Sequence, residues 1–260
     1  MPNISNNHSR YSHQSSTRAT HTKKAAGASD NSGNNISSDN QLSPGSSTSS
    51  GPPGPPNVNG LVIENFIGSG GEISYSPENL KAYFMPHHIS IVGNDSTANV
   101  STGSLNDRVY LGTPVGVPFG VPGGGSVGAS DNNTWTVDTL AGSDLVHVGT
   151  GNNNVANVDL GNNDDTASVQ MNGLTTSMSG NIYNLDGGQG EDTLRLGQLP
   201  PDFDFSTIKS KQQPDGSYQL IISPSNGGPD NIINVSNFES VHYNFTTLSF
   251  ADFIARTTQI

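Results

Sequence analysis

Glycine, aspartate and one large apolar residue come together at residues 187–195 in a spacing that could bind a metal ion. The stretch reads Gly-Gly-Gln-Gly-Glu-Asp-Thr-Leu-Arg and fits the nonapeptide G-G-x-G-x-D-x-U-x, where U is large and apolar. Gly187, Gly188 and Gly190 allow a tight turn with inward carbonyls, and Asp192 supplies an anionic oxygen. Because Ca²⁺ prefers such oxygen ligands, the motif predicts a calcium-binding turn.

The second half of this motif recurs elsewhere in the chain. Asp107, Asp144, Asp165 and Asp230 each end a turn rich in Gly, Ser, Asn or Pro, and alternating apolar residues follow each of them. Asn153 lies nine residues after Asp144 and twelve before Asp165, which is close to the nine-residue period. Stacked turns of this kind clamp Ca²⁺ between them, so we expect Asp144, Asn153 and Asp165 to be further ligands.

These residues resemble the RTX, or haemolysin-type, family of calcium-binding repeat proteins. The segments after the repeats are similar to the module that commonly follows them: Asp192–Leu196, Asp202–Phe205, Asp215–Tyr218, Asn237–Tyr243 and Ala251–Phe253. The resemblance covers about residues 138 to 254. It implies a secreted bacterial protein without enzymatic activity that has Ca²⁺ as its cofactor and folds on binding calcium after export.

The composition predicts a mainly β protein with a thin core. Only 31% of the residues are hydrophobic and 7% aromatic, which suits turns that each bury a few aliphatic side chains against their neighbours. We therefore predict a parallel β-roll or β-solenoid closed by a C-terminal β module. The residues expected to stack inside are Val146, Val148, Val155, Val158, Leu160, Val169, Leu185, Leu194 and Leu196.

Three parts follow from changes in composition along the chain. Residues 1–60 are rich in Ser and Asn, end in a Pro/Gly linker and predict a disordered leader. Residues 61–122 contain short apolar runs and predict a strand-rich segment. Three prolines within residues 114–122 exclude a central strand, so we place the start of the β-roll and C-terminal module at residue 123, giving residues 123–260.

Charge and cysteine content limit the partners and the export route. Residues 61–260 carry six Lys or Arg against twenty Asp or Glu, a surplus of negative charge that disfavours nucleic acid and anionic lipid. The chain has no cysteine, no run of about 18 apolar residues and no apolar signal segment after Met1. We expect secretion without a cleavable signal, by a type I or type III route, and no transmembrane segment.

Other chemistry is less well supported by the sequence. Residues 124–128 fit G-x-S-x-G, but they lack the flanking strand and helix of a hydrolase, and no H-E-x-x-H metalloprotease motif is present. Two alternatives stay open: a type III secreted, harpin-like or effector protein of a plant-associated bacterium, and a β-helix enzyme acting on polysaccharides. Gly-Asn-Asp corners of a metal-free solenoid are a further possibility. The macromolecular partner we expect is a host surface or a cell-wall component.

Overall fold

The computed structural model describes residues 39–42, 62–68, 70–77, 83–112, 130–149, 151–197 and 199–260. Of the predicted leader, only the strand at 39–42 lies within these ranges. The proline-rich segment at 114–122 and the G-x-S-x-G stretch at 124–128 lie outside the described residues.

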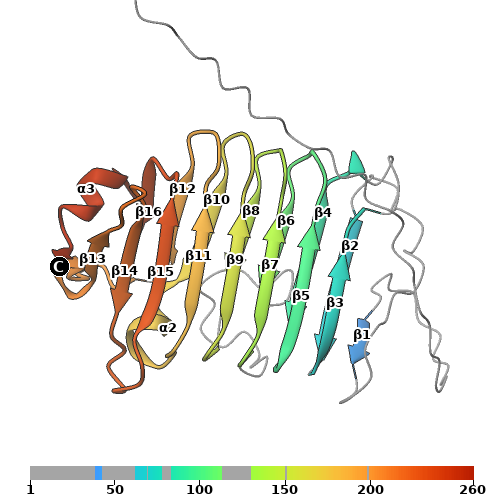
Figure 1. Cartoon of the computed structure of the whole chain (residues 1–260), viewed down its shortest axis with the longest axis horizontal. Coiled ribbons are helices and arrows are strands. Elements are labelled where there is room, and N and C mark those ends of the chain that lie inside the picture. Colours follow the sequence, from blue (N-terminus) through green and yellow to red (C-terminus); the bar gives the residue numbers. More distant parts are fainter. Residues whose placement is uncertain are drawn as a thin grey trace, which may run out of the picture.

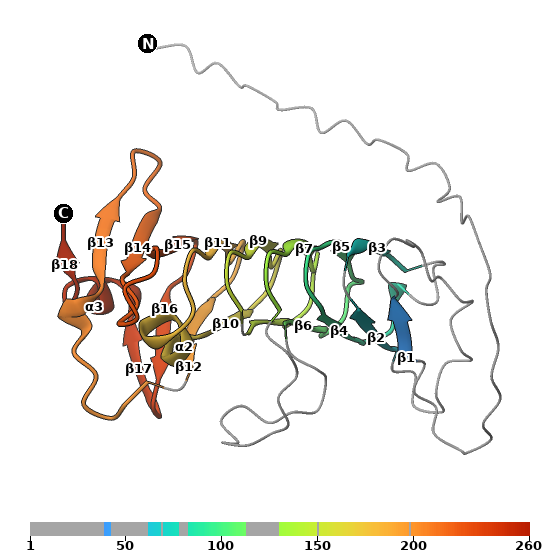
Figure 2. The ribbon, with the colours of Figure 1, turned by 90° about the horizontal axis from the view of Figure 1, so that it is seen from below.

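Two sheets of nine described strands each form the molecule, and Figure 2 shows them as two layers. Sheet A contains, in spatial order, β1 (Asp39–Leu42), β2 (Val62–Gly68), β4 (His87–Val92), β6 (Arg108–Leu111), β8 (Leu145–Val148), β10 (Thr166–Gln170), β12 (Thr193–Gly197), β16 (Ser240–Tyr243) and β17 (Thr246–Ser249). Sheet B contains β18 (Thr258–Gln259), β13 (Lys209–Gln212), β14 (Tyr218–Ile222), β15 (Asn231–Ser236), β11 (Ile182–Asp186), β9 (Val155–Asp159), β7 (Thr134–Asp138), β5 (Ser96–Ser101) and β3 (Gly71–Tyr75). The prediction of a mainly β protein is confirmed.

Consecutive strands from β3 to β12 alternate between the two sheets, and each strand from β3 to β10 pairs in parallel with the second strand after it. We call a sheet B strand and the sheet A strand that follows it a strand pair. The strand pairs succeed one another along the long axis of the molecule (Figure 1). Strands from residues 61–122 and from residues 123–260 belong to the same sheets, since β6 pairs with β8 and β5 pairs with β7.

Antiparallel strands are found at the C-terminal end. β14 pairs antiparallel with both β13 and β15, and β17 pairs antiparallel with β16. A short helix, α3 (Phe250–Ile254), buries Phe253 and Ile254 at the same end. None of the helices in the described ranges has the length and apolar character needed to cross a membrane.

The core lies between the sheets because alternate residues of each strand face inward. In adjacent strands of sheet A, Val146, Ala167 and Leu194 are aligned and fully buried. Eight of the nine residues predicted to stack inside are buried. The exception is Val155, which begins β9 on its outer side and is half-buried.

The two edges of the sheets differ in their connections. Four successive turns from sheet B into sheet A have six residues each, at 102–107, 139–144, 160–165 and 187–192. The connections from sheet A into sheet B vary: one contains the helix α2 (Met171–Thr176), and another contains the 3₁₀ helix η1 (Phe205–Thr207) with β13 and β14. A constraint on length therefore acts on one edge only.

We predict that Leu194→Ala lowers the free energy of unfolding by about 2–5 kcal/mol, because it removes a fully buried side chain between aligned neighbours. Urea unfolding followed by circular dichroism measures this change. Leu105→Ala is the control, since Leu105 is 39% exposed and should change stability little. Equal losses in the two variants would contradict the placement of the core.

Candidate functional site

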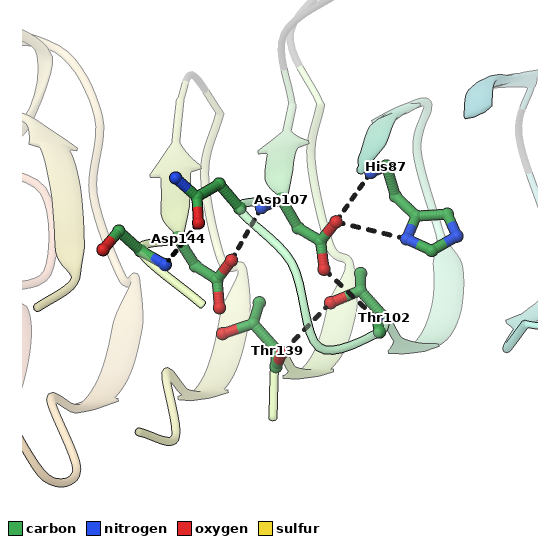
Figure 3. Close-up of polar contacts among 8 residues, drawn as sticks. His87, Thr102, Asp107, Thr139 and Asp144 are labelled. Atoms are coloured by element: carbon green, nitrogen blue, oxygen red, sulfur yellow. Dashed lines mark hydrogen bonds and ion pairs between the residues drawn. The ribbon is translucent and has the colours of Figure 1, made fainter. Parts of the chain in front are cut away.

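Five successive connections from sheet B into sheet A end in an acidic residue that contacts the preceding turn. These residues, the carboxylate row, are Asp107, Asp144, Asp165, Asp192 and Glu239. One side-chain oxygen of each accepts a hydrogen bond from the backbone N–H of the equivalent residue in the preceding turn, at N···O distances of 2.6, 2.6, 2.7, 2.8 and 2.6 Å. Figure 3 shows the start of the row, with Asp107 between His87 and Asp144.

The first residues of these turns are also linked from one turn to the next. The hydroxyl of Thr102 donates to the carbonyl of Thr139 at 3.3 Å (Figure 3). The hydroxyl of Thr139 donates to the carbonyl of Leu160 at 2.7 Å. Both ends of a six-residue turn are therefore held by the next strand pair. This explains why the turn length is constant.

The second carboxylate oxygen distinguishes three members of the row. The Oδ2 atoms of Asp144, Asp165 and Asp192 are buried and have no hydrogen-bond partner among the described residues, and the three residues are at most 3% exposed. In Asp107, by contrast, Oδ2 accepts the N–H of Gly103 at 3.1 Å. A buried charged oxygen without a partner is costly, so either a proton or a cation must neutralise it.

Burial raises the pKa of the same three carboxyl groups above the ordinary value of 3.8. The pKa rises to about 7 for Asp144, to about 8 for Asp165 and to about 6 for Asp192. Neighbouring carboxylates add to these rises by repulsion, whereas the hydrogen bonds from the backbone oppose them. The row therefore favours binding of protons or cations.

The opposite edge of the sheets has the same geometry with neutral side chains. The amide row consists of Asn133, Asn154, Asn181 and Asn231. Their Oδ1 atoms accept hydrogen bonds from the backbone N–H of the equivalent residue one strand pair earlier, at 3.0, 2.9, 2.9 and 3.1 Å. Sequence reasoning missed this row, since spacings of 21, 27 and 50 residues between its members obscure the repeat.

The amide row shows that asparagine satisfies the structural requirement. Its second polar atom is also hydrogen-bonded in three of the four members: Nδ2 donates to the carbonyl of Gly93 in Asn133, to that of Gly151 in Asn181, and to those of Leu174 and Met178 in Asn231. Nδ2 of Asn154 is buried without a partner among the described residues. The carboxylate row forms the same backbone contact but leaves Oδ2 without such a bond in three strand pairs. The fold alone does not require acidic residues at these positions.

The turn at 187–192 contains the complete sequence motif. Gly188 has φ +91°, and a Cβ on it would lie 2.0 Å from the carbonyl oxygen of Gly161, so the close approach of the two turns requires glycine. Gly190 lies equally close to the carbonyl oxygen of Asn163, at 2.2 Å. A Cβ on Gly187 would lie 2.8 Å from Oδ2 of Asp192, so glycine keeps space open beside this carboxylate.

Of the seven residues predicted to bind metal, six lie along one edge. Gly187, Gly188, Gly190 and Asp192 share one turn, and Asp165 and Asp144 end the equivalent turns of the two preceding strand pairs. Asn153 lies in the turn before β9, which belongs to the opposite edge, and its Nδ2 donates to Oδ1 of Asn132. The structure thus brings the aspartates together and leaves Asn153 apart.

A preformed cage of acidic or histidine side chains is absent from the described residues, where no three such groups are placed to hold one ion. The aspartates are stacked one per strand pair instead. Strands of a sheet lie about 4.8 Å apart, so successive aspartates of the row lie about one strand spacing apart. Backbone carbonyls would have to supply the remaining ligands of a cation that needs about six to eight oxygens.

The histidines near the site are not arranged for acid–base catalysis. His87 is buried, and its Nδ1 lies 3.2 Å from Oδ1 of Asp107. Burial lowers the pKa of His147 to about 3, so this side chain is neutral at ordinary pH. His147 is 3% exposed, with Nδ1 3.2 Å from the carbonyl oxygen of Ser168.

We predict that the metal-free protein becomes more stable as the pH falls from 8 to 6.5. A carboxyl group whose pKa is raised in the folded state contributes stability that is complete below 3.8 and is lost as the pH rises through the folded pKa of about 7 for Asp144 and about 8 for Asp165. His147 acts in the opposite sense, but only below its unfolded pKa of 6.5. Denaturant unfolding in chelator at several pH values measures the slope.

Asp165→Asn should flatten this pH dependence, because the amide keeps the hydrogen bond to Asp144 N–H but does not titrate. Asp202→Asn is the matched control, since Asp202 is exposed. A slope that is unchanged in Asp165→Asn, or one of opposite sign in the wild-type protein, would contradict the electrostatics described for the row.

Comparison with known proteins identifies no relative: no protein-family model, no curated protein and no solved structure matches the chain. The RTX resemblance therefore stays a prediction from the motif at 187–195. Function has to be inferred from the geometry of the two edges and of the sheet surfaces.

Proposed function

We propose that this chain is a secreted, non-enzymatic calcium-binding protein of parallel β-roll architecture, in which Ca²⁺ binds along the carboxylate row. One observation carries the proposal: three successive strand pairs place a buried Oδ2 without a partner where the opposite edge uses asparagine. A neutral amide would meet the structural need, so the retained carboxylates are explained best by a cation.

The residues that would hold the ion are Asp144, Asp165 and Asp192, with backbone carbonyls of the turns at 139–144, 160–165 and 187–192. Bound calcium would supply positive charge that neutralises the row. The aspartates already hold the turns in register through Oδ1, so binding requires little reorganisation of the backbone. Gly187 keeps the space beside Asp192 free of a side chain.

Neutralisation of the row would link calcium concentration to folding. Without cation, the deprotonated row carries buried negative charges about one strand spacing apart, which repel one another. With about millimolar Ca²⁺, as outside cells, the folded state would gain the free energy of binding, whereas low cytosolic Ca²⁺ would leave the chain less stable before export. This supports a protein that completes its folding after secretion.

Asp192→Asn tests the proposal at one carboxylate. We predict that Ca²⁺ raises the melting temperature of wild-type protein at pH 8 and that the variant loses most of this gain, because the amide retains the hydrogen bond to Asp165 N–H but lacks the charge. At a Ca²⁺ concentration 100 times Kd, the stabilisation would be about 2.7 kcal/mol. Calorimetric titration of chelator-treated protein measures affinity and stoichiometry directly.

Asp202→Asn removes the same charge from an exposed position and should respond to Ca²⁺ as wild type does. Wild-type protein that melts at the same temperature in millimolar Ca²⁺ and in chelator would refute calcium binding. In that case a row neutralised by protons, in a fold that needs no metal, would be the correct description.

A further inference from the structure

A cavity of about 370 Å³ opens on the outer face of sheet A. It is lined by the ends of the turns and the starts of the strands: His88, Asn106, Asp107, Arg108, Ser143, Asp144, Leu145, Asp164, Thr166 and Arg195. The strand residues among these alternate with inward-facing residues such as Val109, Val146 and Leu194, which are fully buried. The cavity is therefore separate from the core, and its volume is in the range of small-molecule sites.

Both arginines of a long acidic stretch meet in this cavity. Between positions 82 and 208 the sequence has two basic residues, Arg108 and Arg195, against thirteen acidic ones. They are 87 positions apart in the sequence, but both line the same cavity. His88 lies beside Arg108 on the adjacent strand β4. The two arginines of this stretch thus share one cavity, which Asp107, Asp144 and Asp164 also line.

The shape of the cavity indicates an extended ligand. Its lining residues come from β4, β6, β8, β10 and β12 or from the turns that enter them, so it crosses five strands. Arg108 on β6 and Arg195 on β12 are three strand spacings apart across the sheet, which is about 14 Å. A linear molecule with repeated acidic groups can follow this row of strands and contact both arginines.

The other polar residues of the lining can form hydrogen bonds with hydroxyl groups of a ligand. Asn106, Ser143 and Thr166 offer donors and acceptors, and Asp164 offers an exposed carboxylate. A sugar ring advances a linear glycan by a distance similar to the strand spacing, so successive rings can contact successive strands. A uronic acid chain combines hydroxyl groups with carboxylates that guanidinium groups bind by paired hydrogen bonds.

We propose that the outer face of sheet A binds a linear acidic oligosaccharide, with Arg108 and Arg195 contacting uronate carboxylates at its two ends. With two arginines beside Asp107, Asp144 and Asp164, the cavity suits a short ligand with few carboxylates better than polyphosphate. The cavity lining contains no Phe, Tyr or Trp on which a base could stack. Asp107 and Asp144 of the carboxylate row also line this cavity, so binding is tested both with and without calcium.

Calorimetric titration with tetragalacturonate tests this inference. Arg108→Gln and Arg195→Gln should each weaken binding by about tenfold, because each removes a charge-assisted contact. Lys211→Gln is the matched control, since Lys211 is exposed on β13 and does not line the cavity. Circular dichroism and melting of every variant establish that it is folded, and titrations run both in millimolar Ca²⁺ and in chelator.

Three further probes identify the ligand class. Fully methyl-esterified tetragalacturonate has the same length without charge, the galacturonate monomer has the charge without length, and tripolyphosphate has charge without sugar. All three should bind at least about tenfold more weakly than tetragalacturonate.

Equal binding of any of these probes would overturn the assignment to acidic oligosaccharides. So would tetragalacturonate binding that survives both arginine substitutions in folded protein. Tetragalacturonate binding that depends on the arginines supports the oligosaccharide proposal, whether the folded protein is in Ca²⁺ or in chelator. This holds even if the calcium titration shows that the protein binds no Ca²⁺. The two proposals can therefore fail separately.

Discussion

A hydrogen bond from a backbone N–H to the side chain of the next strand pair holds the molecule in register. Acidic side chains form it along one edge of the sheets and asparagines along the other. The residues that enter each strand would otherwise leave buried N–H groups unsatisfied, at a cost of about 1–3 kcal/mol each. The carboxylate row fixes the starts of β6, β8, β10, β12 and β16 in sheet A, and the amide row fixes the starts of β7, β9, β11 and β15 in sheet B. The aliphatic layers between the sheets align as a consequence.

The edge with the carboxylate row tolerates no change in length over four successive turns, whereas the other edge contains α2 and the β13–β14 hairpin. The difference follows from what each turn must position. A six-residue turn places both its first residue and its final aspartate against the next turn. On the other edge only the last residue before the strand has to be fixed, so additional elements can precede it.

Sequence alone predicted the parts of this arrangement that are local. The Gly-Gly-x-Gly-x-Asp order identified the turn at 187–192, and the low apolar content together with short alternating runs predicted a mainly β protein. Stacking was harder to predict, because intervals of 37, 21, 27 and 47 residues separate successive members of the carboxylate row. Glu239, the last member of the row, does not lie in a match to the glycine-rich nonapeptide motif.

Nothing in the sequence indicated that Arg108 and Arg195 share a cavity. Their proximity depends on the number of strand pairs between them and on how many residues the insertions add. Asn153 was grouped with the aspartates because of its spacing of nine residues, but nine residues correspond to half of a strand pair and lead to the opposite edge. Spacing therefore identified the turn type correctly, whereas the assignment to an edge required the three-dimensional structure.

Both rows of side-chain hydrogen bonds point the same way along the molecule, since the donor always belongs to the earlier strand pair and the acceptor to the later one. The two ends are therefore chemically unequal. Removing strand pairs from the N-terminal side leaves side-chain oxygens that water can solvate. Removal from the C-terminal side deprives backbone N–H groups of their acceptors and also removes the antiparallel strands that end the sheets. Evolution can thus shorten or lengthen such a chain from its N-terminal side at lower cost.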